Sequence, residues 1–523
     1  MTANEKRLFV SDDGKNLVFT FCITSSLFLL WGFCNGMIDV MDKHFQEELH
    51  LTLSQSAWVQ FAHYLGYFLM SLPAGWLAIK LGYKGGIIAG LLLVACGGFW
   101  FVPATHIAAF WAFLLGVCLI ASGLTFLETI ANPYTTVLGP KEFAATRINM
   151  AQSYNGVGWF FGPIAGAMFF YSKDSSGHST GSQTLWIPYA GVAVVVLALA
   201  AAFYFAPVPD IKTADEYHID ENGAGDSDPA AARQIDRSLV YWLMLFNAAV
   251  LVGVFDMILW VALQTLGVDA WKMSVTLWTA GLAGVFAAAL ILLPVARRIS
   301  HHSIWSHPHF SGATLAQFFY VAAQAGIFSF LINYMTSEVP SLPKSWTTGW
   351  LQSWFEMKGD IVHFSDKAAS NLASLGFFCF LAGRVSGAAI LKKFSPHKVL
   401  GIYGFMNVLI CLLIFLKLGW VSVICVFLSY FFMSIMFPTI FALGIHGLGA
   451  RAKRASGFIV MAIMGGAMLP KLMGHVADVY DMSRGYIVPL FCFVLIGAYA
   501  LLWPSFSQTD PATKAQPPQK LPA

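Results

Sequence analysis

Charged residues are scarce in this chain. Asp, Glu, Lys and Arg make up 11% of its 523 residues, whereas 57% of the residues are hydrophobic. The mean hydropathy of +0.67 is far above that of a soluble protein of average composition. The apolar residues occur in runs of about 20 or more, whereas the strands of an outer-membrane barrel would be shorter and of alternating polarity. The composition therefore predicts an all-α polytopic membrane protein.

The chain also lacks the patterns that accompany catalysis, metal binding or nucleic-acid binding. The formal net charge is only +3, and no Lys/Arg cluster is long enough to indicate nucleic acid as a partner. Its 8 cysteines form no CxxC or Cys/His pattern, so we expect small buried apolar residues rather than disulfides or metal ligands. No nucleophile, metal or nucleotide constellation stands at a span end. We therefore expect neither an enzyme nor a metal or organic cofactor.

Apolar segments of membrane-spanning length occur 14 times, and we expect each to form a transmembrane helix. Six segments precede residue 207, two follow near 239–264 and 274–296, and six come last. The first group lies near 17–42, 54–79, 84–104, 107–136, 145–171 and 185–206, and the last near 311–335, 368–391, 398–417, 419–446, 455–480 and 486–506.

A polar break separates the first six segments from the rest. Between residues 207 and 238, eight Asp or Glu residues stand against one Lys and two Arg, so a solvated acidic linker is predicted there. The chain then divides into an N-terminal six-helix bundle (1–206), the cytoplasmic linker (207–238), an inserted pair of transmembrane helices with a connecting loop (239–307), a C-terminal six-helix bundle (308–506) and a cytoplasmic tail (507–523).

The distribution of basic residues predicts the orientation. When the N-terminus is placed inside, the cytoplasmic segments hold 20 Lys and Arg residues and the opposite segments hold eight. Lys and Arg are retained preferentially in the cytoplasm, so both termini are expected there. This orientation depends on the count of 14 spans, because removing one of the two middle spans would invert everything after residue 300.

Two carboxylic acids lie inside apolar segments, Asp39 in the first and Glu128 in the fourth. A charge at membrane depth costs roughly 3 kcal/mol on insertion scales unless it faces a wet cavity, has a partner or takes up a proton. Groups that exchange protons with a cavity can drive transport, so both acids are candidate proton-coupling residues. A structural role stays open for Asp39, which could cap its helix or pair with Lys43 four residues on.

Amide side chains accompany both acids at helical spacing. Asn35 precedes Asp39 by four residues and Asn132 follows Glu128 by four, so each pair projects from one face of its helix. Pro133 removes the N–H donor that would have served a carbonyl one turn earlier, so a bend is expected in the fourth helix.

The fifth segment carries an amide face of its own, formed by Asn149, Gln152 and Asn155. Three neighbouring polar stripes in a protein whose remaining surface faces lipid imply a shared aqueous cavity. Amides both donate and accept hydrogen bonds, which suits the hydroxyl groups of a sugar. Alternatively, the amides could join helices to one another.

Other polar or small residues receive structural interpretations. Glycines recur every four residues at Gly158, Gly162 and Gly166, which permits close helix packing. Arg147 and Arg384 are expected to snorkel or pair at the cytoplasmic face. Three further polar residues interrupt apolar segments and receive no assigned role: His63, Asp256 and Lys471.

Six longer motifs surround these residues. They are FLLWGFCNGMID, GLTFLETIANPYTTVLGP and RINMAQSYNGVG in the first half, and LAQFFYVAAQAGIFSFLINY, KKFSPHKVL and MSIMFPTIFALGIHGLG in the second. Together they resemble the L-fucose:proton symporter family of the major facilitator superfamily. The resemblance covers about residues 17–206 and 308–506 and leaves the inserted pair of spans outside.

The resemblance implies two six-helix bundles related by pseudo-symmetry, with a sugar site between them at the midplane and alternating access by rocking. It implies that Asp39 and Glu128 couple proton movement to the sugar. It also implies that Asn35, Gln152 and Asn155 line the cavity.

On the second bundle, the resemblance points to Gln317 and Gln324 as sugar contacts, and their spacing of seven places them on one helix face. The chain also departs from the family. Gly36 stands where a second Asn is usual, and His63 replaces an aromatic residue. The sugar is therefore expected to be held somewhat differently.

The segment GWLAIKLGYK resembles the gating motif of the superfamily. Lys80, Gly82 and Lys84 are present, but Ile79 stands where an Asp is usual. The contacts by which this motif holds the inner face closed in the superfamily are therefore expected to be different in this protein.

These patterns predict a secondary active transporter of a bacterial-type inner membrane that imports a monosaccharide, with L-fucose as the leading substrate, by proton symport. A monomer with sugar, proton and bilayer as partners is expected. Two alternatives stay open. One is a glucose/galactose or other hexose transporter that uses protons or sodium, and the other is a non-transporting sugar sensor whose inserted spans and linker dock a partner.

Overall fold

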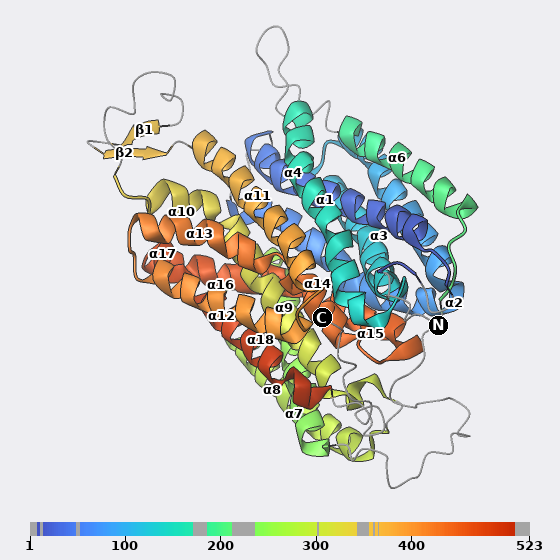
Figure 1. Ribbon diagram of the computed structural model, residues 1–523. Coiled ribbons are helices and arrows are strands. Elements are labelled where there is room, and N and C mark those ends of the chain that lie inside the picture. The colour runs from blue at the N-terminus through green and yellow to red at the C-terminus, as the bar shows by residue number, and fades with distance from the viewer. Residues whose placement is uncertain are drawn as a thin grey trace.

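Long helices that lie side by side make up most of the structure, a computed structural model (Figure 1). It describes residues 8–10, 14–48, 53–170, 186–211, 236–300, 303–341, 355–358, 361–364 and 366–507. Apolar runs form these helices because a helix satisfies its own backbone hydrogen bonds in an apolar medium. The expected all-α architecture is confirmed. Most of the linker and of the tail lie outside the described residues, so the division of the chain into domains stays a prediction.

The N-terminal half consists of long helices. Its elements are α1 (Val18–Glu48), α2 (Leu53–Ile107), α3 (Phe110–Val137), the 3-10 turn η1 (Lys141–Phe143), α4 (Ala144–Phe170) and α6 (Trp186–Phe205). Helix α1 packs against α4, and α2 packs against both α3 and α6. Helices α1 and α4 cross closely at their glycines. A Cβ added to Gly158 would lie 2.3 Å from the Leu29 carbonyl oxygen, and one added to Gly162 would lie 2.5 Å from that of Phe33. These contacts agree with the predicted packing role of Gly158 and Gly162.

Helix α2 combines two of the expected spans and reverses direction between them. Gly82 interrupts its helical backbone with φ 71° and ψ −178°. A Cβ added to Gly86 would lie 3.6 Å from the Cα of Ala78. An uninterrupted helix would separate these two positions by about 12 Å, at 1.5 Å per residue. The chain therefore turns back at Gly82, and both arms of α2 can cross the same membrane.

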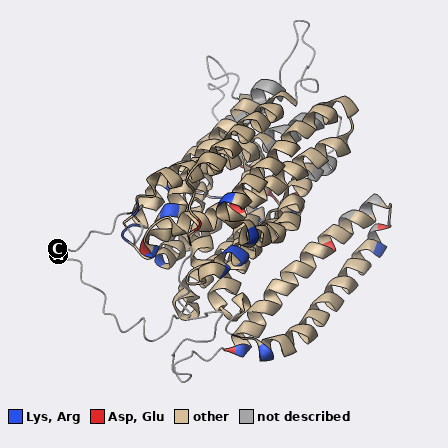
Figure 2. Cartoon of the chain, turned by 90° about the vertical axis from the view of Figure 1, so that its right-hand side faces the viewer, with Lys and Arg blue, Asp and Glu red and all other residues tan. Residues whose placement is uncertain are grey.

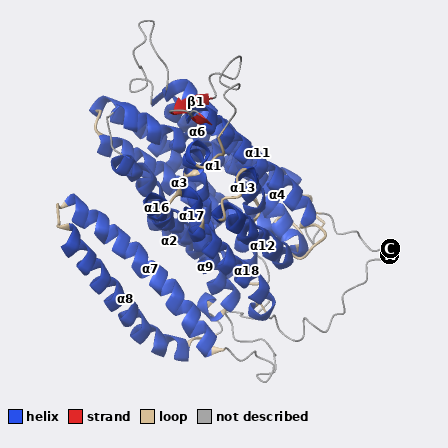
Figure 3. Ribbon diagram, turned by 90° about the vertical axis from the view of Figure 1, so that its left-hand side faces the viewer, coloured by secondary structure: helices blue, strands red, loops and turns tan. Residues whose placement is uncertain are grey.

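The inserted segment forms a helical hairpin of α7 (Arg237–Thr265) and α8 (Ala270–Arg298). Asp269 begins α8 by accepting hydrogen bonds from the backbone N–H groups of Trp271 and Lys272. The hairpin lies on one side of the helix bundle, with α7 nearer to it than α8 (Figures 2 and 3). Large apolar side chains of α8, among them Trp278 and Phe286, are exposed, as expected for a helix that faces lipid.

The C-terminal half repeats the pattern of long helices with several breaks. It comprises η2 (Ile304–Ser306), α9 (Pro308–Ser329), α10 (Leu331–Ser337), β1 (Phe355–Lys358), β2 (Ile361–Phe364), α11 (Asp366–Ile390), α12 (Pro396–Phe415), α13 (Trp420–Met433), α14 (Met436–Gly444), η5 (Gly449–Arg451), α15 (Ala452–Met461), η6 (Ala462–Met464), α16 (Gly465–Val479), α17 (Met482–Gly485) and α18 (Ile487–Phe506). Strands β1 and β2 form a short antiparallel hairpin, with Phe355 opposite Phe364, that the sequence analysis did not predict.

The number of membrane spans agrees only in part with the expected 14. By length and composition, 11 described helices could cross a membrane, or 12 if the bent pair α9–α10 is one span. This count includes α2 as one helix, although α2 combines two of the expected spans. It omits α4, because Arg147 and the amide face lower the mean hydropathy of that helix. The count of 14 and the cytoplasmic location of the termini therefore stay predictions.

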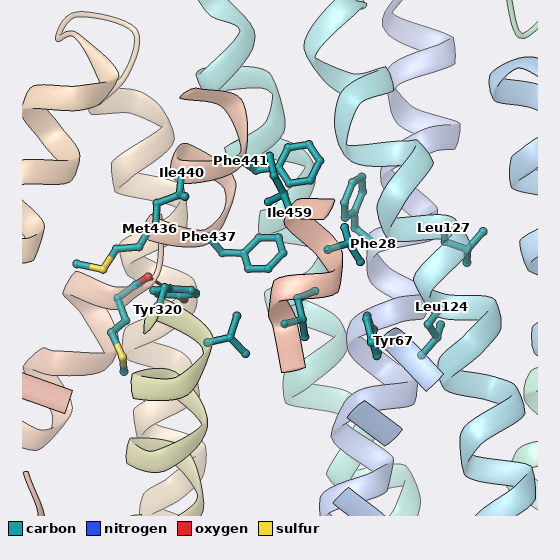
Figure 4. Close-up of a cluster of buried hydrophobic side chains, with 14 of the residues drawn as sticks. Phe28, Tyr67, Leu124, Leu127, Tyr320, Met436, Phe437, Ile440, Phe441 and Ile459 are labelled. Carbon is teal, nitrogen blue, oxygen red and sulfur yellow. Dashed lines mark hydrogen bonds between the residues drawn. The ribbon is translucent and has the colours of Figure 1, made fainter. Parts of the chain in front are cut away.

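The two halves meet along two seams and share a buried core. Helix α2 packs against α15 along one seam, and α4 packs against α11 along the other. Between the seams, the ring of Phe437 from α14 lies 6.2 Å from that of Trp31 in α1 and 6.2 Å from that of Tyr320 in α9. Figure 4 shows Phe437 between Tyr320 on one side and Phe28 on the other. The candidate site lies in this shared region.

Candidate functional site

Arg384 of α11 is the polar centre of the region between the halves. It is 2% exposed, and its guanidinium donates to groups on both halves of the molecule. Nη1 donates to Asn155 Oδ1 at 2.7 Å, to Gln152 Oε1 at 3.3 Å and to the Gln152 backbone carbonyl, whereas Nε donates to the Ser434 carbonyl at 3.0 Å. Arg384 therefore joins α11 to α4, and its expected place at the cytoplasmic face is wrong.

The carbonyl that receives Nε is free because of a proline. Pro438 has no N–H to donate to the carbonyl of Ser434 one turn earlier, and the chain breaks there between α13 and α14. The neighbouring Met433 carbonyl accepts from the Tyr320 hydroxyl at 3.1 Å. The motif MSIMFPTIF thus places two backbone acceptors beside Arg384 and Tyr320.

Glu128 of α3 is the buried acid of the region. It is 2% exposed, and within the described part of the chain neither carboxyl oxygen has a hydrogen-bond partner. Arg384 and Tyr67 are close enough to interact with it electrostatically. An unpaired carboxylate at this depth is costly, so Glu128 either holds a proton or depends on the positive charge of Arg384.

A chain of amides connects α3, α4 and Arg384. Gln152 donates from Nε2 to Asn132 Oδ1 at 3.1 Å, and Asn155 donates from Nδ2 to the Phe28 carbonyl at 3.3 Å. All three amide side chains are completely buried, and in the described part Asn132 Nδ2 has no acceptor. Three of the residues predicted to bind substrate are therefore adjacent, and one of them keeps an unused donor.

Asn35 lies at a second polar corner, between α1 and α2. The Trp31 indole N–H and the Asn35 amide both donate to the hydroxyl of Tyr67. The ring of His63 lies 5.1 Å from that of Tyr67. Among the described residues, Asn35 Oδ1 and His63 Nδ1 have no hydrogen-bond partner. His63 therefore belongs to the same region as the predicted site residues.

The C-terminal half contributes fewer polar side chains. Gln317 of α9 is completely buried, and neither of its amide atoms has a partner among the described residues. It stands one turn before Tyr320, which interacts electrostatically with Arg384. Gln324 is only partly buried on the same helix. Gln317 therefore fits a ligand-binding role better than Gln324.

Stacked aromatic rings and a hydrogen bond between side chains close the region on the two sides of Arg384. Along the seam of α4 and α11, the ring of Trp159 stacks on Phe377 with centroids 5.5 Å apart. On the other side of Arg384, Asn149 donates to Thr439 Oγ1 at 3.2 Å. The structure thus shows the candidate site in a closed form.

Other predicted residues lie elsewhere. Asp39 is part of α1, but its side chain lies outside the described residues, so its role stays a prediction. Lys471 of α16 stacks on Trp260 of α7 at 4.1 Å. A Cβ added to Gly281 of α8 would lie 2.4 Å from the carboxylate of Asp256. Lys471 therefore faces the inserted hairpin, and Asp256 lies within the hairpin facing α8, so neither belongs to the candidate site.

The predicted gating motif lies at the reversal of α2. Tyr83 donates its backbone N–H to Asp210 Oδ1 at 3.4 Å, and Lys453 of the other half lies 3.0 Å from the same oxygen. Lys84 donates to the Ala206 carbonyl at 2.9 Å, whereas Lys80 lies over the ring of Trp76 at 3.9 Å. Asp210 thus supplies a carboxylate to a motif that has Ile79 at the usual acidic position.

Arg147 has a structural position at the same end. Its buried guanidinium donates to the carbonyls of Thr135 at 3.1 Å, Pro140 at 2.8 Å, Gly139 at 3.1 Å and Leu8 at 3.2 Å, and also to that of Thr136. It therefore satisfies the free carbonyls at the end of α3. It does not snorkel, because it is completely buried.

The buried amides can donate and accept hydrogen bonds to a small polar molecule, and the Glu128 carboxyl is an acid that can hold or release a proton. Within the described residues, no cluster of three or more His, Cys, Asp or Glu side chains could hold a metal ion. The central position of Arg384 and the contacts of Trp31 and Tyr67 were not predicted from the sequence. The freed carbonyl one turn before Pro438 was a signal that could have indicated Arg384.

Comparisons with known proteins agree with this architecture. The profile of the Major Facilitator Superfamily matches residues 19–336. The L-fucose-proton symporter of Escherichia coli K12 is 31% identical over 493 residues, which cover 93% of this chain and 93% of that protein. A glucose/galactose transporter of Brucella abortus is 25% identical over 489 residues, which cover 93% of this chain and 95% of that transporter.

Solved structures show the same relationship. The crystal structure of the Escherichia coli fucose:proton symporter superimposes with a TM-score of 0.65 at 28% identity, covering 95% of this chain and all of that one. A crystal structure of this symporter in the outward conformation superimposes with a TM-score of 0.66 at 29% identity. The match covers 94% of this chain and 99% of that chain. The chain is therefore a multi-pass membrane transporter that belongs to the Major Facilitator Superfamily and, within it, to the family of the L-fucose-proton symporters.

Proposed function

We propose that this protein imports a monosaccharide by proton symport with alternating access, and that L-fucose is its leading substrate. Similar proteins from Escherichia coli and Haemophilus influenzae, at 31% and 26% identity, are L-fucose-proton symporters. The buried amides of Asn132, Gln152 and Asn155 suit sugar hydroxyls, because each amide can donate and accept.

The observation that carries proton coupling is the burial of Glu128 without a hydrogen-bond partner in the described part of the chain. A neutral, protonated Glu128 avoids most of the cost of a buried charge and can donate its proton to a sugar hydroxyl as a hydrogen bond. When the proton leaves, the carboxylate attracts the Arg384 guanidinium. The protonation state of Glu128 thereby changes how strongly the two halves are held together.

The same geometry suggests how sugar enters this cycle. In the closed form, Nη1 of Arg384 donates hydrogen bonds to the side-chain oxygens of Gln152 and Asn155. Sugar hydroxyls that compete for these amide oxygens loosen the link between α11 and α4, which are the helices of one seam. We propose that Asp39 relays or gates protons from the outer side of the membrane.

The direct test is Glu128→Gln in purified protein reconstituted into proteoliposomes. The amide cannot exchange a proton, so we expect uphill accumulation of radiolabelled L-fucose driven by a pH gradient to fall at least tenfold. Exchange of internal for external sugar should persist, because it needs no net proton movement. Glu142→Gln, which removes an exposed carboxylate of η1, should behave like wild type. Retained accumulation in Glu128→Gln would contradict the assigned coupling site.

A second experiment tests proton coupling without a mutation. De-energised cells that express the protein should alkalinise their medium when L-fucose is added, since each sugar enters with a proton. Sugar uptake without alkalinisation would exclude proton symport.

The identity of the relatives also supports a second substrate class. Glucose/galactose transporters of Brucella abortus and Helicobacter pylori match over at least 91% of this chain. Competition of L-fucose uptake by a panel of hexoses, measured with and without sodium, separates these alternatives. Saturable uptake by proteoliposomes that contain only this chain would exclude a sugar sensor that does not transport.

A further inference from the structure

The inserted hairpin lies over the seam where the two halves of the molecule meet at α2 and α15. Asn247 of α7 donates to the Ser311 carbonyl of α9 at 3.0 Å and accepts from Thr314 Oγ1 at 2.7 Å. On the other half, the ring of Phe68 in α2 lies 5.9 Å from that of Phe255 in α7. Helix α7 therefore contacts both halves.

A cavity of about 260 Å³ lies beneath α7 at this seam, and we call it the seam pocket. It is lined by Phe68 of the first half, Ala248 and Leu251 of α7, Phe318 of α9, and Phe458 and Met461 of α15, among others. Its wall is almost entirely apolar, because Asn247 and Thr314 use their polar atoms on each other and on backbone carbonyls. The pocket therefore suits an apolar ligand rather than a sugar.

Exposed arginines surround one end of the seam pocket. Arg237 lies seven residues before Met244 of the wall, and Arg454 lies four residues before Phe458, so each shares a helix face with the pocket. They stand about 10 Å and 6 Å beyond these wall residues, at 1.5 Å per residue. Arg297 and Arg298 lie in the last turn of α8. Figure 2 shows basic residues, in blue, at this end of the hairpin, where α8 ends and α7 begins.

A carboxylate at this end is already engaged in capping a helix. Asp236 accepts the backbone N–H groups of Ser238 and Leu239 at 3.1 and 3.0 Å as α7 begins. Among the described residues at this end of the pocket, the four arginines therefore outnumber the carboxylate of Asp236, and the net charge there is positive. Arginines beside an apolar intramembrane crevice match the chemistry of an anionic phospholipid, whose charged headgroup lies at the interface and whose chains extend into the bilayer.

We propose that the seam pocket binds an acyl chain of an anionic phospholipid, with the headgroup held by Arg237 and Arg454. The hairpin forms the outer wall of this lipid site. Because Phe68 belongs to one half and Phe318 and Phe458 to the other, the bound chain contacts both halves.

The test uses the full-length protein in nanodiscs that contain a phosphatidylglycerol with a diazirine in its acyl chain. After irradiation, mass spectrometry of peptides should locate adducts on the α7 and α15 residues of the wall. Ala248→Phe, which fills the pocket, should reduce these adducts at least fivefold. Ala283→Phe makes the same change on the exposed face of α8 and should leave the adducts unchanged. Ala462→Leu adds volume to the pocket from its wall in η6. This variant replaces Ala248→Phe in the experiment if Ala248→Phe does not fold.

The headgroup is tested with the same probe on phosphatidylcholine. Wild type should label the wall at least threefold more with phosphatidylglycerol, and the double variant Arg237→Gln/Arg454→Gln should lose this preference. Equal labelling by both lipids in wild type would overturn the anionic assignment. Labelling of the wall that both filling variants leave unchanged would overturn the lipid site itself.

Discussion

Two buried arginines show how one residue type serves different purposes in this protein. Among the described residues, the acceptors of Arg147 are carbonyls of its own half, and Arg147 closes the end of α3. Arg384 donates across the interface to Gln152 and Asn155, and it lies near Glu128. The same burial therefore satisfies the end of one helix in the first case and links the two halves in the second.

Arg384→Lys tests that link at the scale of one residue. A lysine ammonium is a point charge without the planar fork, so it cannot reach Ser434, Gln152 and Asn155 together. We expect sugar uptake in proteoliposomes to fall at least tenfold, which corresponds to about 1.4 kcal/mol. The charge is kept, so the variant should remain folded by size-exclusion chromatography.

Arg484→Lys is the matched control, because this exposed arginine stacks on Phe415 away from the site. Its uptake should equal that of wild type. If Arg384→Lys also transported at the wild-type rate, the geometry of the guanidinium fork would be irrelevant to transport.

At the scale of elements, the breaks in helices position the polar groups of the molecule. The break before α14 exposes the carbonyls of Met433 and Ser434, which accept from Tyr320 and Arg384. The break at Gly82 reverses α2 and brings Tyr83 to Asp210. The sequence indicated Gly82 through a motif, but it did not reveal Asp210, which lies over 120 residues away in the chain.

The reversal of α2 gives a prediction of stability. Gly82 has φ 71° and ψ −178°, a conformation that is essentially restricted to glycine. An added Cβ would also lie 3.3 Å from the Asp210 carboxyl carbon. Gly82→Ala should therefore destabilise the protein by about 1–3 kcal/mol. A lower midpoint of thermal unfolding in detergent would reveal this loss.

Gly191→Ala makes the same chemical change in the helix α6, where nothing lies within 4 Å of an added Cβ. Alanine is favoured over glycine inside a helix by roughly 0.5–1 kcal/mol, so this variant should be as stable as wild type or more so. If Gly82→Ala also kept the wild-type midpoint, the reversal would not depend on glycine.

At the scale of the whole molecule, the two halves are closed against each other along both seams. A Cβ added to Gly156 of α4 would lie 3.7 Å from the Cβ of Leu381 in α11. This separation is within the range for a disulfide, which is about 3.5–4.5 Å. Oxidation of Gly156→Cys/Leu381→Cys should therefore lock this seam and lower uptake at least tenfold, with recovery on reduction.

A disulfide within one half provides the control. A Cβ added to Gly401 would lie 3.6 Å from the Cβ of Ala500, and both positions belong to the C-terminal half. Gly401→Cys/Ala500→Cys should form its disulfide without loss of uptake, because rocking does not separate α12 from α18. Undiminished uptake by the oxidised Gly156→Cys/Leu381→Cys protein would show that this seam does not open during transport.

The all-helical membrane architecture and the polar residues of the candidate site could be predicted from the sequence, because span length and one-sided polar stripes are local properties of the chain. It identified Glu128, Asn132, Gln152 and Asn155, whose helical spacing and apolar surroundings are visible in the sequence. The packing of the helices places Arg384 against these amides, Lys471 against Trp260 of α7, and Asp256 inside the hairpin beside Gly281 of α8. Such contacts depend on how distant helices pack, and the spacing of residues along one helix does not specify its neighbours.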